Sequence, residues 1–359
     1  MSNELTYILG AGASYQSIPV VKTFPNRFKE FLADINKIYQ EDSLKYFELF
    51  SSCSRFSKEI TSHQSFDTYF KKLFHTNSLD LVDEFKQVLN LYFTWEHLED
   101  DYETKWKKSN TMHGLRHRNE LEFTKITKID KRYDALIAGL LKPVIGKSEV
   151  FCKTNFITWN YDLNLFFSLK NYFAPEKTTK DFLNSISNNE YEWNIDNQIS
   201  VINMNGYFYS SKFDDLTSLN EKEGISVMKE ILENGFFEAS TGKDANKIKF
   251  AWETEIEHAK VAKEKIAASE NIVVIGYTFP LYNRLVDFEY LSHNDFGTHK
   301  KIVIQDPNSI AIRQNLFDLF EINDNEYIQK NVVALLDCDS FYVPSNIYGI
   351  NRNNAPNVW

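Results

Sequence analysis

Cysteine is scarce in this chain of 359 residues, and the three cysteines, Cys53, Cys152 and Cys338, lie far apart in the sequence. Since no two of them form a C-x-x-C pair, the sequence excludes a four-cysteine zinc ribbon, and we expect no bound metal. Isolated thiols are typical of a reducing compartment, which predicts a cytoplasmic location. The first residues also lack the basic region and apolar core of a signal peptide, so we expect none.

Long apolar runs, an excess of positive charge, internal repeats and low-complexity tracts are also missing. No stretch reaches the roughly 18 apolar residues of a membrane-spanning helix, so we expect no membrane association. The formal net charge is −10, which argues against direct nucleic-acid binding because that needs clustered lysines and arginines. Hydrophobic residues still make up 43% of the chain and aromatic residues 15%, and this composition predicts a folded protein with a sizeable core.

Strand-like and helix-like segments alternate at both ends of the chain. Short apolar runs that predict strands occupy residues 5–9, 151–158, 199–204, 271–275, 301–305 and, at an edge, 332–336. Amphipathic stretches that predict helices follow at residues 26–39, 163–173, 250–269, 283–287 and 310–320. This order predicts an α/β fold with a Rossmann-like parallel sheet flanked by crossover helices.

The segment between the first helix and residue 144 has a different pattern, which is almost wholly helical. Ser65 has the position of an N-cap, and residues 79–98 repeat apolar side chains at a helical period. Before this segment, Pro19 and Pro25 predict a loop, because each disfavours helix at the residue preceding it. We expect that loop to lie over the ligand side of the first turn of the sheet.

Two polar stretches carry little secondary-structure signal. In residues 99–120, which predict a solvated connection, His113 and His117 lack the glutamate of an H-E-x-x-H motif and do not predict a metal site. Residues 178–198 are rich in asparagine and serine and predict a surface excursion. We therefore expect a discontinuous sheet domain of residues 1–42 and 145–345, a large helical insertion of residues 43–144, and a C-terminal tail of residues 346–359.

A turn of small residues follows the first predicted strand and consists of Gly10, Ala11, Gly12, Ala13 and Ser14. Small residues allow the backbone to turn sharply and to approach a ligand closely. Backbone N–H groups at such a turn form a site for a pyrophosphate. The third glycine of the dinucleotide fingerprint is missing, so a strand and helix packed through small residues explain the turn equally well.

Three further strand ends carry polar or small residues. They hold Thr158, Trp159, Asn160, Tyr161 and Asp162, then Gly276, Tyr277, Thr278 and Phe279, and finally Gln305 and Asp306. Ligands of open parallel sheets bind at the carboxyl ends of strands, and Asp306 has a position from which it could accept hydrogen bonds from ribose hydroxyls. Each residue also has a structural explanation: Asn160 or Asp162 as a helix cap, and Asp306 as the opening of the turn at Pro307. Their joint occurrence favours a dinucleotide site.

Taken together, these motifs resemble the sirtuin-like NAD-consuming domain in the divergent form found in bacterial anti-phage defence proteins. The T-x-N-x-D strand end of that family matches Thr158, Asn160 and Asp162. Other family landmarks resemble the glycine turn with Ile18 and Pro19, the segment from Phe66 to Phe70, the segment from Gly276 to Pro280 with Asn283, Arg284 and Asp287, and the segment from Ile304 to Pro307. The resemblance implies that NAD is bound by Gly10, Ala11, Gly12, Ala13, Ser14, Pro19, Thr158, Gly276, Tyr277, Thr278 and Asp306.

The resemblance also implies the catalytic residues. Asn160 is expected to position the nicotinamide ribose or a water, and Asp162 to orient the nicotinamide carboxamide. The family usually has a histidine before the glycine of an H-G pair, and here Asn205 stands before Gly206. Because an asparagine accepts no proton near neutral pH, the chain lacks a base that typically contributes about 10²–10⁴-fold to the rate. We therefore expect slow or conditional turnover.

The function that the resemblance implies is hydrolysis of the nicotinamide–ribose bond of NAD⁺, with NAD as substrate, in the effector subunit of an anti-phage abortive-infection system. An enzyme that depletes NAD needs control, so we expect a homo-oligomer or a complex with a second defence subunit that senses infection. The first alternative is a catalytically impaired sensor that binds NAD or ADP-ribose. The second is a scaffold with a vestigial pocket. A lysine deacylase is disfavoured, since both the zinc ribbon and the histidine are missing.

Overall fold

The computed structural model describes residues 4–98, 127, 129–189, 191–208, 228–229, 232, 247–253, 256–291, 300–321 and 330–348. The charged stretch with His113 and His117 lies outside these residues. So do residues 349–359 of the predicted C-terminal tail.

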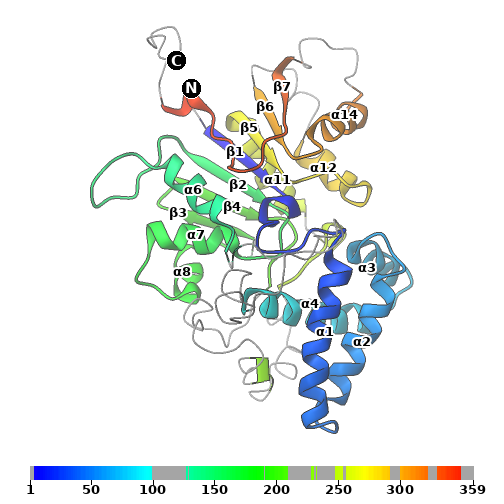
Figure 1. Cartoon of the computed structure of the whole chain (residues 1–359). Helices are drawn as coiled ribbons and strands as arrows, with labels where there is room; N and C mark the ends of the chain where they lie inside the picture. Colours follow the sequence, from blue (N-terminus) through cyan, green and yellow to red (C-terminus); the bar gives the residue numbers. More distant parts are fainter. Residues whose placement is uncertain are drawn as a thin grey trace, which may run out of the picture.

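The described strands form one seven-stranded sheet of order β3-β4-β2-β1-β5-β6-β7, as Figure 1 shows. The strands are β1 (Glu4–Leu9), β2 (Thr154–Thr158), β3 (Glu192–Ile195), β4 (Ile199–Asn203), β5 (Ser269–Ile275), β6 (Lys301–Gln305) and β7 (Val332–Leu335). Every pair is parallel except that of β3 with β4. The prediction of an α/β fold with a Rossmann-like, mostly parallel sheet is confirmed.

Strand β1 lies at the centre of the sheet and decides where a ligand can bind. It pairs with β2 on one side and with β5 on the other, in parallel along its whole length. The chain therefore crosses from one half of the sheet to the other next to β1, and its carboxyl end is a topological switch point. All six residues of β1 are buried, as expected for a parallel strand that is covered on both faces.

Alternate residues of β1 serve two different cores. Leu5, Tyr7 and Leu9 belong to the larger one, which also contains residues of α1 (Phe24–Glu41), α2 (Phe47–Ile60), α3 (Phe66–His75), α4 (Leu79–Leu98), α6 (Lys131–Leu140), α7 (Asn164–Phe173) and α8 (Thr179–Ile186). Ile8 belongs to the second, with residues of α11 (Ile256–Ala268), α12 (Arg284–Tyr290) and α14 (Ser309–Leu319). Helices thus cover both faces of the sheet.

Helices α1 to α4 gather at one side of the molecule (Figure 1). Their interior is aromatic, with the Phe28 ring 5.2 Å from that of Phe56 and 5.4 Å from that of Tyr92. A buried ion pair joins α1 to α4, because the Arg27 guanidinium lies 2.9 Å from Glu96. Helix α1 therefore packs with helices of residues 43–144, while the boundaries of that insertion stay a prediction.

Three sequence predictions differ from the structure. The helix predicted at residues 250–269 is interrupted, because Ala251–Glu253 form a 3₁₀ turn, α11 begins at Ile256 and Ser269 already belongs to β5. Helix α1 begins at Phe24 and includes Pro25, which lay in the predicted loop; proline is tolerated in a first helical turn because its missing N–H has no partner there. The stretch 178–198 is no irregular excursion, since it forms α8 and the edge strand β3. Its polar composition hid the burial of Phe182 and Trp193. The N-cap at Ser65 is confirmed, for its hydroxyl accepts from the Thr68 N–H at 3.2 Å.

Within the described ranges, no helix combines the length and apolar character that crossing a membrane requires. The cysteines are unpaired; Cys53 and Cys152 are buried and Cys338 is half-buried.

Candidate functional site

A cavity of about 510 Å³ lies at the carboxyl ends of the central strands. Ligand pockets of proteins span roughly 300–1,000 Å³, so a small organic ligand fits this space. The predicted site residues that line it are Gly10, Ala11, Gly12, Pro19, Asn160, Asp162, Asn205, Gly276, Tyr277, Thr278 and Asp306. Ala13, Ser14 and Thr158 are buried outside the lining. The structure therefore brings all four predicted strand ends to one cavity.

The glycine turns after β1 and β5 interlock through their backbones. The Gly10 N–H donates to the Ile275 carbonyl at 2.9 Å, and the Gly12 N–H to the Gly276 carbonyl at 3.1 Å. A Cβ atom at position 10 would lie 2.5 Å from the Gly276 oxygen, and one at position 12 would lie 2.8 Å from the Gly276 Cα. Gly276 also has a φ of +61°, which disfavours any side chain. The packing explanation of these glycines is therefore supported.

The pyrophosphate interpretation of the first turn stays a prediction. Three N–H groups of that turn are engaged within the protein, since the Ala13 N–H donates to the Gly10 carbonyl at 2.8 Å in addition to the two bonds above. Ala11 also lines the cavity, and so does Lys22, whose side chain is exposed on the loop before α1. Lys22 and Arg132 are the cationic side chains of the lining, and Arg132 is paired with Asp130.

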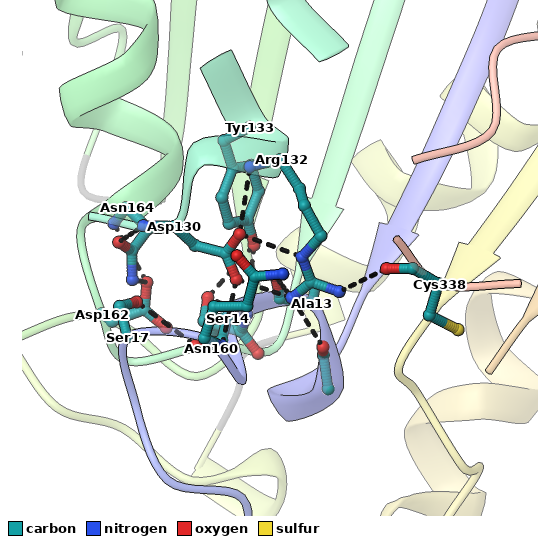
Figure 2. A network of polar contacts seen from close by, with 12 residues as sticks. Ala13, Ser14, Ser17, Asp130, Arg132, Tyr133, Asn160, Asp162, Asn164 and Cys338 are labelled. Atoms are coloured by element: carbon teal, nitrogen blue, oxygen red, sulfur yellow. Dashed lines mark hydrogen bonds and ion pairs between the residues drawn. The ribbon is translucent and has the colours of Figure 1, made fainter. Parts of the chain in front are cut away.

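Asn160 follows β2 and is held from two sides, as the network in Figure 2 shows. Its backbone N–H donates to the Thr158 hydroxyl at 3.1 Å, and its side-chain nitrogen donates to the Ser14 hydroxyl at 3.2 Å. Ser14 also contacts the Tyr133 hydroxyl at 3.2 Å. Ser14 and Thr158 thus position Asn160 from behind the cavity wall. With its nitrogen bound to Ser14, Asn160 lines the cavity in a fixed orientation.

Asp162 and Asp306 both have a structural task as well as a place in the cavity. One Asp162 oxygen accepts from the backbone N–H of Asn164 at 3.0 Å and from its side chain at 2.7 Å, at the start of α7. Asp306 accepts from the Asn308 N–H at 2.7 Å and so shapes the turn after β6. Burial raises the pKa of both carboxyls. The turn explanation of Asp306 is therefore supported. The helix-cap explanation is not, since the N-cap of α7 is Leu163 and Asp162 lies one residue before it.

Asn205 follows β4 and faces the same cavity. Its side-chain nitrogen donates to the Trp159 carbonyl at 2.8 Å, which fixes the orientation of the amide. Its side-chain oxygen is buried and has no hydrogen-bond partner among the described residues. A buried acceptor that lacks a partner is costly, and this oxygen is closed to solvent, so it is a local cost to stability and not an open acceptor for a ligand.

An aromatic stack forms another part of the wall. The rings of Trp159 and Tyr277 lie 5.3 Å apart and nearly parallel, and both residues line the cavity. Behind them, the hydroxyls of Tyr277 and Tyr290 donate to one oxygen of Asp287, at 2.9 and 2.7 Å. Burial raises the pKa of Asp287 to about 7. Asp287 therefore fixes Tyr277 in the wall without lining the cavity itself.

Arg132 is a cavity residue that the sequence analysis missed. Its guanidinium pairs with Asp130 at 2.6 Å and donates to the carbonyls of Ala13 at 3.1 Å and Cys338 at 3.2 Å (Figure 2). It joins the start of α6 to the glycine turn and to the segment after β7. Three of its partners are backbone carbonyls, those of Gly12, Ala13 and Cys338, which no residue pattern reveals.

Asp67 is the second residue that was missed as a site residue, although its segment, Phe66 to Phe70, is one of the family landmarks. It lines the cavity from the start of α3. The Tyr161 hydroxyl donates to one of its oxygens at 3.0 Å, and the Tyr282 hydroxyl to the other at 3.5 Å. Burial raises the pKa of Asp67 to about 6.

Within the described part of the chain, no group of three or more histidine, cysteine, aspartate or glutamate side chains is arranged to hold a metal. The chain matches no protein-family model and no curated protein. The relation to sirtuin-like domains therefore stays a prediction that rests on the motifs.

Proposed function

We propose that the cavity binds NAD⁺ and that the protein hydrolyses its nicotinamide–ribose bond. The observation that carries the proposal is the convergence of four strand ends on one cavity, with Asn160, Asp162 and Asn205 in its wall. The switch point beside β1 is where open α/β sheets bind their ligands. The stacked rings of Trp159 and Tyr277 add a planar surface for the ligand.

In this proposal the protein acts mainly by positioning. Breaking the bond leaves positive charge on the ribose, while nicotinamide departs neutral and needs no strong acid. Asn160 holds a ribose hydroxyl or the attacking water, and Asp162 orients the nicotinamide carboxamide. Fixed dipoles directed at developing charge can supply much of a rate enhancement. Asn205 contributes no base.

The test is incubation of the purified protein with NAD⁺ and chromatography of nicotinamide and ADP-ribose, over a range of protein concentrations. We expect Asn160→Ala to abolish product formation while Glu257→Gln, on the surface, leaves it unchanged. We expect Asn205→His to raise the rate, because a ring N–H can replace the bond to the Trp159 carbonyl and the second nitrogen can accept a proton. Absence of product from both wild type and Asn205→His would refute hydrolysis.

A sensor that binds NAD or ADP-ribose without turnover is the second candidate. The observation that favours it is the fixed amide of Asn205, whose nitrogen is committed to Trp159. Calorimetric titration with NAD⁺ separates the two functions. Binding that Asn160→Ala weakens, together with no product, would identify the sensor, and the lack of any binding would leave a scaffold.

The biological setting belongs to the same proposal. We place the protein in the cytoplasm as the effector of an anti-phage defence system, in which depletion of NAD stops the infected cell. Control then comes from homo-oligomerisation or from a second subunit that senses infection. Mass measurement in solution, alone and with products of neighbouring genes, tests this part, and a monomer under all conditions would contradict it.

A further inference from the structure

We infer that Asp67 is the proton acceptor of this site, and that it serves the role for which Asn205 is chemically unfit. The inference rests on the proposed hydrolysis of NAD⁺ and adds a catalytic residue to it. Asp67 is a buried carboxylate in the cavity wall, and it lies on helix α3, away from the strand ends.

The start of α3 holds Asp67 in place. The Ser65 hydroxyl accepts from the Thr68 N–H, and the Thr68 hydroxyl accepts in turn from the Ser65 N–H, both at 3.2 Å. This reciprocal cap fixes the first turn of the helix. Phe66 and Tyr161, whose rings lie 5.7 Å apart, pack this turn against the end of β2. Asp67 therefore belongs to a rigid part of the cavity wall. Its neighbour there is Tyr161, which directly follows Asn160 in the sequence.

The surroundings of Asp67 are apolar apart from three hydroxyls, those of Tyr161, Tyr282 and Ser65. Phe66, Phe93 and Tyr161 line the cavity beside it, and the side chain is only 6% exposed. Each carboxylate oxygen receives one tyrosine hydroxyl, from Tyr161 or Tyr282. Ser65 and the Asp67 backbone donate as well, so a water or ligand hydroxyl in the cavity replaces one of these donors when it binds the carboxylate; of the two tyrosine contacts, the one with Tyr282, at 3.5 Å, is the longer.

Burial explains why this carboxylate can act as a base. It raises the pKa of Asp67 to about 6, and hydrogen bonds from Tyr161, Tyr282, Ser65 and the Asp67 backbone oppose that rise only in part. A general base works best when its pKa lies near the working pH. At neutral pH Asp67 is thus ionised and yet more basic than an exposed aspartate.

Other charged groups act on Asp67 only through its tyrosine partners. Burial raises the pKa of Tyr161 and of Tyr282, the charge of Asp67 raises both further, and Glu253 on Tyr161 and Asp287 on Tyr282 make smaller contributions in the same direction. Lys71 donates to the Tyr282 carbonyl at 3.4 Å. The two tyrosines therefore stay protonated and donate hydrogen bonds to Asp67. Within this group of three side chains, the Asp67 carboxylate is the one that gains or loses a proton near neutral pH.

The proposed step balances as follows. The bond between ribose C1′ and the nicotinamide nitrogen breaks, and its electron pair neutralises the charge of the departing ring. A water oxygen forms a bond to C1′, and one water proton passes to the Asp67 carboxylate. Release of that proton to solvent restores the site, so the net products are nicotinamide, ADP-ribose and a proton.

The experiment measures kcat and KM for NAD⁺ between pH 4.5 and 8.5. For wild type we expect kcat/KM to rise with pH and to level off above about 6, where Asp67 loses its proton. Asp67→Asn should lose this rise and lower kcat by about 10²–10⁴-fold, with little change in KM. Tyr282→Phe should move the rise to higher pH, because the lost hydroxyl lowers the pKa of Asp67 in the wild type.

Glu257→Gln is the control, since Glu257 is an exposed carboxyl paired with Lys260 and does not line the cavity. It should leave the pH of the rise unchanged. If wild type hydrolyses NAD⁺ while Asp67→Asn keeps its kcat and pH profile, Asp67 is not the base and the proposed function stands. If neither wild type nor Asn205→His forms product, the proposed function and this inference fail together. If only Asn205→His forms product, the proposed function stands and Asp67 is not the base. An unmoved rise in Tyr282→Phe also contradicts the assignment to Asp67.

Discussion

Replacing Gly10 by alanine tests whether the glycine turns serve backbone packing. The new Cβ would lie 2.5 Å from the Gly276 oxygen and 2.7 Å from the Tyr277 Cα. Both neighbours are backbone atoms, so they cannot rotate away as a side chain could. The backbone of Gly10 is extended, with a φ of −120°, and alanine adopts this conformation without strain. Any loss of stability therefore comes from the clash alone.

The size of the effect follows from that geometry. Overpacking of a tight interior typically costs about 1–3 kcal/mol. We expect Gly10→Ala to fall in this range, and Gly276→Ala to exceed it, because its positive φ adds roughly 1–3 kcal/mol of strain. Urea denaturation followed by circular dichroism measures the difference in the free energy of unfolding.

Two glycines elsewhere provide controls. Gly139 lies within α6, where a Cβ would meet its nearest neighbour at 3.6 Å, so Gly139→Ala should be neutral or stabilise by up to about 1 kcal/mol. Gly146 has a φ of +73° with nothing near its Cβ position, so Gly146→Ala should show conformational strain alone. If Gly10→Ala is as stable as Gly139→Ala but no longer binds NAD⁺, the glycine serves ligand approach and the packing argument is wrong.

Three further predictions concern polar groups of the site. Burial raises the pKa of Asp287 to about 7, so the stabilisation from its bound proton is complete below about pH 4 and is lost as the pH rises through 7. In Asp287→Asn, the melting temperature should therefore depend less on pH between pH 5 and 8 than in the wild type. An unchanged dependence would contradict this. Arg132→Ala leaves Asp130 buried without its ionic partner and should lower the free energy of unfolding by about 3–5 kcal/mol. Adding Asp130→Asn to Arg132→Ala should recover part of this loss. No recovery would mean that the bonds from Arg132 to backbone carbonyls dominate. Asn205→Ala removes the bond to the Trp159 carbonyl and should cost about 1 kcal/mol by urea denaturation, a value near zero showing that the bond is not formed in solution.

Much of the sheet was predictable because parallel strands carry their own signal. The central strands are short apolar runs with turn residues after them, and β5 and β6 lie within two residues of their predicted positions. The edge strand β3 was missed because its burial alternates, with Trp193 and Ile195 inward and polar residues between them. A solvated edge has no apolar run that distinguishes it from a loop.

The site was predictable only where its residues follow strands. Asn160, Asp162 and Asp306 occupy strand ends, and parallel strands end at one edge of the sheet. Asp67 reaches the cavity from a helix that lies over a hundred residues away from its tyrosine partner Tyr282 in the sequence. Arg132 acts through backbone carbonyls. Both contacts depend on how α3 and α6 pack on the sheet, and the order of elements alone does not contain that information.

The structure changes which residues argue for a ligand. The glycine turn was the first signal in the sequence, yet its glycines are explained by the approach of two backbones, and that approach needs no ligand. Asn205 is the opposite example. In the sequence it counted against catalysis, because the family usually has a histidine at this position. In the structure it lines the cavity with its amide fixed by the Trp159 carbonyl. Evidence for the site therefore rests less on the glycines than on the polar wall formed by Asn160, Asn205 and Asp67.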